Sequence, residues 1–308
     1  MSQPSPTEPL PDLAADAARI ARLVLAEDGA VDLTTAVALR RARPGIGAIE
    51  ARAETVVAGL RYAGAVAAAA GCSVRWEVAE GAMIPAGALG HLEGDLAMIL
   101  RAERPLLNLL QRACGIASAT REFVRAVAGL ECRILHTRKT APGLRLFDAA
   151  AVVCGGGMLH RLDLAHTVMI KDNHWRAIHG DGGMLGDVLA EARRRGALAC
   201  QVEVETESQL REACAAGADR ILVDNQTPAT VRVWGDLARA LRSGITIEAT
   251  GGITLANARE YAEAGADYLS IGAITHSVGA ADLALEIREE GGGKREELAP
   301  PSSHFPSY

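Results

Sequence analysis

Six short apolar runs in the second half of the chain constrain its fold most. They are CRILHT (132–137), TVMIKD (167–172), CQVEVET (200–206), RILVDN (220–225), ITIEAT (245–250) and YLSIGA (268–273). Stretches with helical spacing separate them, and polar residues gather at their carboxyl ends. Strands that are buried on both faces, with polar residues at their carboxyl ends, are typical of a parallel β/α barrel. An open doubly wound sheet has the same alternation and is the alternative.

A weak internal repeat favours the barrel. REACAAGADRILVDN (211–225) and REYAEAGADYLSIGA (259–273) match at an offset of 48 residues. Because the run ITIEA lies between them, each β/α unit takes half of that offset, about 24 residues.

The first half of the chain has a different rhythm. Residues 12–28 carry apolar residues at helical spacing, and residues 46–100 mix short β-like runs with an alanine-rich helix. A long helical pattern follows, which we expect Pro105 to break or bend. The two ends, 1–11 and 290–308, are rich in Gly, Pro and Ser and are predicted to be disordered.

Composition excludes several classes of protein. The 308 residues are 49% hydrophobic and 23% charged, which is typical of a globular protein with a sizeable core. No apolar run approaches the roughly 18 residues that span a bilayer, and the start of the chain lacks a secretory signal pattern. We therefore expect a cytoplasmic protein without a membrane partner. The six cysteines have no metal-ligand spacing and are predicted to be buried free thiols.

Charge is distributed unevenly along the chain. The net charge of −6 argues against general nucleic-acid binding. Between His136 and Arg176, six Lys or Arg outnumber three Asp or Glu, a balance of +3, so the remaining 26 basic and 35 acidic residues carry −9. Such a basic segment in an acidic protein suits a small anionic ligand better than a polymer. Two of the chain's three lysines, Lys139 and Lys171, lie within it.

In a closed barrel, the polar residues at the strand ends would meet at one mouth. They are His136, Arg138, Lys139, Lys171, Asp172, Asn173, His174, Glu203, Glu205, Asp224, Asn225, Glu248, Gly251, Gly252 and Gly272. This mixture of cations, carboxylates and glycines fits a ligand with phosphates and carboxylates, and a divalent ion between a phosphate and the protein. The segment CGGGMLHRLDL adds a glycine loop directly before His160 and Arg161.

These segments resemble those of the quinolinate phosphoribosyltransferase family in order and approximate spacing. The matching segments are HTRKTAPGLR, CGGGMLHRLDL, TVMIKDNH, VEVET, ILVDN, EATGGI and SIGAITHS. Upstream, AERPLLNLLQRACGIAS resembles the family helix AERTxLNxLQxxSGIAT, and VVAGL resembles VLAGL. The resemblance covers about residues 12–288.

The resemblance implies a fold, an assembly and a reaction. An α+β N-terminal domain over 12–115, completed by a C-terminal helix at about 277–289, would pack on an incomplete parallel β/α barrel over 116–276. The protein would be a homodimer, or a higher oligomer built from it. With Mg²⁺ it would join quinolinate to phosphoribosyl pyrophosphate, giving nicotinate mononucleotide, pyrophosphate and CO₂.

The resemblance also assigns roles on the pyridine side of the site. Arg138, His160 and Arg161 would bind the two carboxylates of quinolinate, which suit guanidinium forks. Arg104 would reach into the site of the partner subunit. Lys139 would stand at the junction of the pyridine and the phosphoribosyl group, as would Lys171.

On the phosphoribosyl side, Glu205 and Asp224 would hold the ribose hydroxyls and Mg²⁺. Glu205 is preferred to Glu203 because of its spacing to the LVDN segment. The backbone cradle for the 5′-phosphate would consist of Thr250, Gly251 and Gly272, with His276 near it.

Three departures from the family pattern leave the pyridine substrate open. His136 stands where the family usually has Asp or Gly, Met158 and Leu159 replace a more polar pair, and EDGAVDLTT departs from DxGxGDxTT. The alternatives are a paralogue that acts on another pyridine or aromatic acid, and a non-catalytic barrel that senses phosphoribosyl pyrophosphate or a nucleotide. A third is another phosphate-binding barrel enzyme, which leaves TRKT and KDNH unexplained.

Overall fold

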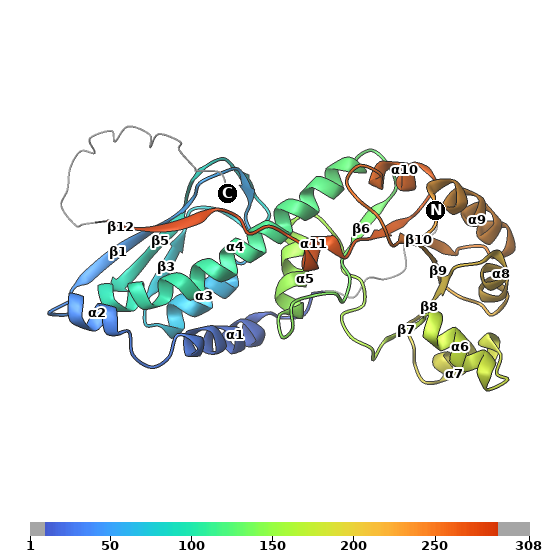
Figure 1. Ribbon diagram of the computed structural model, residues 1–308, viewed down its shortest axis with the longest axis horizontal. Coiled ribbons are helices and arrows are strands. Elements are labelled where there is room, and N and C mark those ends of the chain that lie inside the picture. The colour runs from blue at the N-terminus through green and yellow to red at the C-terminus, as the bar shows by residue number, and fades with distance from the viewer. Residues whose placement is uncertain (1–9, 289–308) are drawn as a thin grey trace, which may run out of the picture.

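The computed structural model describes residues 10–288, so most of both predicted disordered segments lies outside the described residues. Figure 1 shows two halves, each built around a sheet and joined by the long helix α4 (Leu96–Ala126). Among the described residues, no helix is long and apolar enough to cross a membrane.

The N-terminal half contains a four-stranded antiparallel sheet in the order β12-β1-β5-β3. Its strands are β1 (Pro44–Ala51), β3 (Ser73–Trp76), β5 (Gly87–Asp95) and β12 (Leu283–Arg288). Helices α1 (Ala14–Glu27), α2 (Leu33–Ala38) and α3 (Leu60–Ala69) accompany it, with a two-stranded pair, β2 (Thr55–Val56) and β4 (Met83–Ile84).

The expectation of a C-terminal helix at about 277–289 was wrong. The segment from Leu283 forms β12, which pairs antiparallel with β1 from Ala51↔Leu283 to Ile46↔Arg288. Leu283 and Leu285 are buried, whereas Glu286 is exposed. This alternation with a period of two is that of a strand with one buried face.

Helix α4 connects the two halves without a break. It runs for 31 residues through Pro105, so this proline does not break the helix. A proline removes only its own N–H from the helix ladder, and burial of Pro105 and its neighbours Leu106 and Leu107 favours continuation. The helix contacts α3 and β1 in the N-terminal half and α5 and β6 in the C-terminal half.

The C-terminal half is an incomplete parallel β/α barrel, as predicted. All neighbouring strands in the order β6-β11-β10-β9-β8-β7 are parallel, and β6 and β7 form the two edges. The six predicted runs form β6 (Arg133–Leu135), β7 (Thr167–Ile170), β8 (Ala199–Val204), β9 (Arg220–Asp224), β10 (Thr246–Thr250) and β11 (Tyr268–Ser270). The helices are α5 (Arg145–Cys154), α6 (Asp172–Gly180), α7 (Leu185–Arg194), α8 (Glu207–Ala215), α9 (Pro228–Leu241), α10 (Ala258–Glu263) and α11 (Ala273–His276).

The strand register brings the carboxyl ends together. Thr250 lies level with Asp224 on one side and Ser270 on the other, and Ser270 lies level with Leu135. The residues that follow β6 and β7 therefore lie at the same edge of the sheet as Asp224 and Thr250.

The cysteines agree with the prediction of free thiols. All six are free, and all are buried except Cys154, which is partly buried. Burial raises the pKa of each thiol, which keeps it protonated at neutral pH.

Candidate active site

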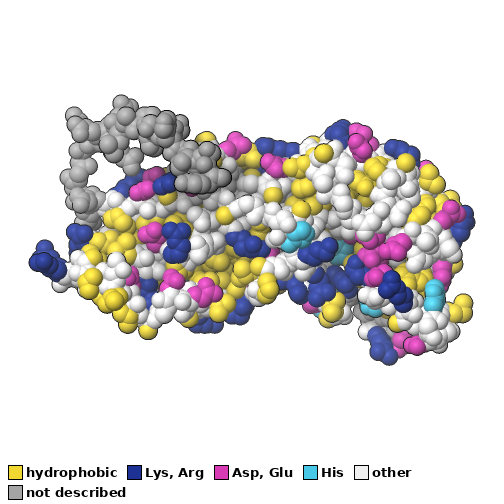
Figure 2. All heavy atoms as spheres, in the orientation of Figure 1, with side chains coloured by type: hydrophobic (Ala, Val, Ile, Leu, Met, Phe, Trp, Pro, Cys, Tyr) yellow, Lys and Arg dark blue, Asp and Glu magenta, His cyan; other side chains and the backbone are white. Residues whose placement is uncertain are grey.

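A cavity of about 620 Å³ opens at the carboxyl ends of the barrel strands. Eight of the predicted site residues line it: Arg138, Lys139, His160, Arg161, Lys171, Asp224, Thr250 and Gly251. Figure 2 shows Lys and Arg side chains gathered where the two halves meet, with Asp and Glu side chains beside them on the barrel side.

Three of these cations form no ion pair with any carboxylate in the described part of the chain. Among the described residues, neither Arg138 nor Lys139 forms an ion pair, and Arg138 Nε is buried without a hydrogen-bond acceptor. Among the described residues, the guanidinium of Arg161 donates to the carbonyl of Thr167, at 3.2 Å, and to no carboxylate. Burial, and then the charge of Arg138, lower the pKa of Arg161 below its usual value. Positive groups held together without counter-charge favour an anionic ligand.

Lys171, in contrast, forms an ion pair with Glu203, which also lines the cavity. Glu203 lies on β8, and Trp175 Nε1 donates to its backbone oxygen at 2.8 Å. Glu205, the residue preferred from its spacing, follows the end of β8, is exposed and does not line the cavity. Glu203 and Glu205 have the same parity along the chain, so side-chain alternation does not separate them. They differ because β8 ends at Val204, which leaves Glu203 within the strand and Glu205 after it. The role assigned to Glu205 remains a prediction.

Asp224 lies next to a backbone turn suited to phosphate. Asn225 donates its side-chain amide to Asp224 Oδ2 at 2.6 Å and takes a left-handed conformation with φ 51°. Gly251, with φ 81°, packs against it, and a Cβ there would lie 2.2 Å from Asn225 Oδ1. Burial raises the pKa of Asp224, and Lys171 and Lys139 oppose that rise.

Gly272 and His276 adjoin the cavity without lining it. A Cβ on Gly272 would lie 2.9 Å from His276 Nε2 and 3.2 Å from Lys139 Cδ. Arg104 lies apart, on α4, with a side chain that is 61% exposed and 4.0 Å from Glu103. The cavity of a single chain therefore does not include Arg104.

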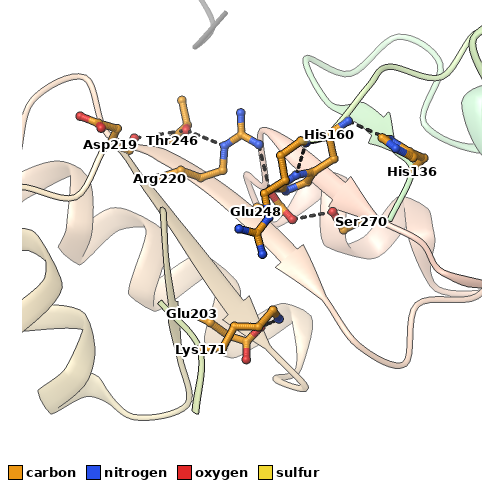
Figure 3. A network of polar contacts seen from close by, with 10 residues as sticks. His136, His160, Lys171, Glu203, Asp219, Arg220, Thr246, Glu248 and Ser270 are labelled. Atoms are coloured by element: carbon orange, nitrogen blue, oxygen red, sulfur yellow. Dashed lines mark hydrogen bonds and ion pairs between the residues drawn. The ribbon is translucent and has the colours of Figure 1, made fainter. Parts of the chain in front are cut away.

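In the wall of the cavity, Glu248 is the centre of a buried polar network (Figure 3). Arg220 donates to its Oε2 at 3.0 Å, Ser270 Oγ donates to its Oε1 at 2.5 Å, and His160 Nε2 lies 3.3 Å from its Oε2. Burial alone would raise the pKa of Glu248, but His160, Arg220 and Ser270 lower it. Glu248 is therefore ionised, and its Oε2 faces Nε2 of His160.

A second network holds the loop that carries Lys139. Arg112 on α4 makes a two-pronged ion pair with the buried Asp148, at 2.8 and 2.7 Å, and Asp148 also accepts from Ala141 N at 3.0 Å. Thr275 Oγ1 donates to the carbonyl of Lys139 at 2.8 Å. The backbone from the carbonyl of Lys139 to Ala141 is thus tied to the barrel and, through Asp148, to α4.

Other lining residues did not stand out in the sequence. Met169 and Leu222 give the cavity an apolar wall, and Ser270 contributes a hydroxyl. Met169 and Leu222 are ordinary core residues of β7 and β9, so nothing in their type distinguished them.

The fold and the cavity together define an incomplete β/α barrel with a cation-rich cavity at the carboxyl ends of its strands. Family comparison gives the class its name. A model of the family "Quinolinate phosphoribosyl transferase, C-terminal domain" matches residues 116–286, and "Quinolinate phosphoribosyl transferase, N-terminal domain" matches residues 32–114. The chain belongs to the quinolinate phosphoribosyltransferase family and is an enzyme of that type.

Individual relatives agree with this assignment. The "nicotinate-nucleotide pyrophosphorylase [carboxylating]" of Mycobacterium leprae is 37% identical over 292 residues, covering 90% of this chain and 100% of that protein. The human protein of the same description is 34% identical over 260 residues, 83% of this chain and 86% of that protein. A solved nicotinate-nucleotide pyrophosphorylase from Francisella tularensis superimposes with a TM-score of 0.83 at 30% identity, covering 91% of this chain and 98% of that one.

Proposed function

We propose that this protein transfers the phosphoribosyl group of phosphoribosyl pyrophosphate to quinolinate, with loss of CO₂. The observation that carries the proposal is a set of three cations, Arg138, Lys139 and Arg161, that form no ion pair with a carboxylate of the described residues. They lie beside Asp224 and a glycine turn in one cavity. A dicarboxylate and a phosphorylated ribose together supply the negative charges that this arrangement lacks.

The pyridine would lie on the side of Arg138 and Arg161. Each guanidinium group can donate two parallel hydrogen bonds to one carboxylate. The apolar side chains of Met169 and Leu222 line the same cavity and suit the face of an aromatic ring. The ribose and its 5′-phosphate would then lie toward Asp224 and Gly251.

The reaction needs no nucleophilic side chain. The ring nitrogen of quinolinate forms a bond to C1 of the ribose as the bond from C1 to the pyrophosphate oxygen breaks, and pyrophosphate leaves with that electron pair. The nitrogen is then positively charged, so it stabilises the electron pair left at ring C2 when CO₂ departs, and a proton from solvent completes the product. Lys139 offsets the charge on the leaving group, while the arginines orient the ring.

The residues present fit Mg²⁺ as a cofactor bound together with substrate. Glu203 and Asp224 offer carboxylate oxygens in the cavity, and Mg²⁺ is typically held by one or two carboxylates plus substrate phosphates. Among the described residues there is no group of three or more His, Cys, Asp or Glu side chains arranged to hold a metal without substrate. When bound, Mg²⁺ would neutralise negative charge on the pyrophosphate.

We also infer a cytoplasmic homodimer. Six free thiols without a disulfide are typical of a reducing compartment. Arg104 is exposed and outside the cavity of its own chain, which agrees with a role in the site of a partner subunit.

A substrate comparison tests the proposed function. Purified protein with Mg²⁺ and phosphoribosyl pyrophosphate is given quinolinate or nicotinate, and nicotinate mononucleotide and CO₂ are measured. We expect both products from quinolinate and no reaction with nicotinate, which lacks the second carboxylate. Consumption of nicotinate or another acid, but not quinolinate, would favour the paralogue. If no acid reacts while phosphoribosyl pyrophosphate raises the melting temperature, the non-catalytic sensor replaces the proposal.

A further inference from the structure

His136 is a buried histidine that the proposed reaction does not use. It follows β6 directly, and its side chain is completely buried. Its Nδ1 accepts a hydrogen bond from the backbone N–H of His160 at 2.8 Å (Figure 3). An imidazole nitrogen that accepts must carry a lone pair, so the ring proton of neutral His136 lies on Nε2.

The next residue along the loop is held in the same way. Nδ1 of His160 accepts from the backbone N–H of Arg161 at 2.7 Å. Two successive N–H groups, those of residues 160 and 161, therefore end on two imidazole rings. Just before them, Met158 N donates to Ile134 O at 2.8 Å and joins the loop to β6. The backbone that carries Arg161 is thus held by hydrogen bonds to β6 and to His136, the residue that follows β6.

We propose that His136 is a positioning residue of the site, whose neutral imidazole holds the backbone of His160 and thereby places Arg161 against the ligand carboxylate. The proposal rests on the proposed function, because that function makes Arg161 a ligand of the pyridine dicarboxylate. His136 itself touches no substrate, since it does not line the cavity.

The surroundings of His136 support this role. Burial lowers its pKa to about 4, with smaller contributions from the neighbouring His160 and Arg145, so the ring stays neutral at neutral pH. A protonated ring would have no lone pair for the N–H of His160. An apolar side chain at this position would leave that buried N–H without an acceptor, which is costly in a water-excluded site.

Two substitutions of His136 distinguish the hydrogen bond to His160 N from the packing of the side chain alone. In His136→Asn the Oδ1 atom is bonded to Cγ, as Nδ1 is in histidine, and can accept from His160 N. In His136→Gln the oxygen lies one bond further out, at the place of Nε2. We expect KM for quinolinate to rise about 10-fold or more in the Gln variant and to stay within about 3-fold in the Asn variant.

The split between kinetic constants shows whether the effect is local. KM for phosphoribosyl pyrophosphate and the melting temperature should change little in either variant, because the phosphoribosyl side of the cavity does not depend on residues 160 and 161. Equal KM values for quinolinate in the two variants, or a parallel rise in both KM values, would overturn the proposal.

A spectroscopic measurement tests the proposal without turnover. In long-range ¹H–¹⁵N spectra of the ¹⁵N-histidine protein at neutral pH, His136 should show an unprotonated Nδ1 and a protonated Nε2. The His136→Asn variant assigns the signal. A proton on Nδ1 would refute the positioning role even in an enzyme that uses quinolinate. Loss of quinolinate turnover by the wild-type protein would instead contradict the proposed function.

Discussion

At the scale of single residues, the two cavity lysines have different surroundings. Lys171 forms an ion pair with Glu203, whereas the side chain of Lys139 has no hydrogen bond or ion pair with any described residue. A compact ammonium that forms no ion pair can stabilise the negative charge that develops on a leaving group. The loop around it is nevertheless fixed, by Asp148 at Ala141 N and by Thr275 at the carbonyl of Lys139.

Substitution of Lys139 should therefore affect turnover and not folding. We expect Lys139→Ala to lower kcat about 100-fold or more, because it removes one preorganised charge from the transition state. Lys139→Arg should recover little, since the wide guanidinium does not fit beside Gly272 and His276. Steady-state kinetics and melting curves check both variants. Unchanged kinetics in Lys139→Ala would exclude this lysine from the reaction.

Sequence reasoning predicted the cations of the cavity but not the contacts that position them. Arg138, Lys139, Arg161 and Lys171 follow predicted strands or a glycine loop, so topology alone brought them to one cavity. Residue spacing favoured Glu205, but β8 ends at Val204, and Glu203 within the strand lines the cavity. A sequence pattern does not fix a strand end to a single residue. The acceptor role of His136 depends on a contact across 24 residues, which no local pattern reveals.

At the scale of elements, six apolar runs were sufficient to predict the barrel strands, because strands buried on both faces have few alternatives. Two differences from a simple pattern have physical causes as well. Pro105 was expected to break or bend α4, and the helix is not broken there because burial of its neighbours offsets the lost hydrogen bond. The helix expected at about 277–289 is a strand because β1 offers an unpaired edge to Leu283 and the residues after it.

The turn after β10 gives a prediction at this scale. Gly251→Ala should destabilise the protein by about 1–3 kcal/mol beyond the cost of its positive φ, because the new Cβ would overlap Asn225 Oδ1. KM for phosphoribosyl pyrophosphate should rise, since Asn225 orients Asp224. Gly244→Ala is the control, with φ 79° and no atom within 4 Å of its Cβ. Urea unfolding and kinetics compare the two, and equal losses would show that the contact does not matter.

At the scale of the whole molecule, neither half is complete without the other. Strand β12 follows the entire barrel in sequence and yet forms the edge of the N-terminal sheet. Helix α4 packs on both halves, and the ion pair between Arg112 and Asp148 joins it to the barrel. Residues from both halves, such as Ile49 and Val223, belong to one buried core.

The contribution of β12 can be measured along one strand. Leu283→Ala removes a side chain that is 4% exposed and should lower the free energy of unfolding by about 2–5 kcal/mol. Ile287→Ala changes the same face at a site that is 39% exposed and should cost less than about 1 kcal/mol. Chemical denaturation distinguishes them. Similar small losses in both variants would mean that β12 adds little to the N-terminal sheet.

The return of β12 also sets an order of assembly during synthesis. More than 230 residues separate Ala51 at the end of β1 from its partner Leu283, so the free edge of β1 waits until the whole barrel has left the ribosome. A chain that stops short of Leu283 keeps an unpaired strand edge, which is a surface for aggregation and for chaperone binding. The N-terminal sheet can therefore gain its last strand, β12, only after the whole barrel has been synthesised.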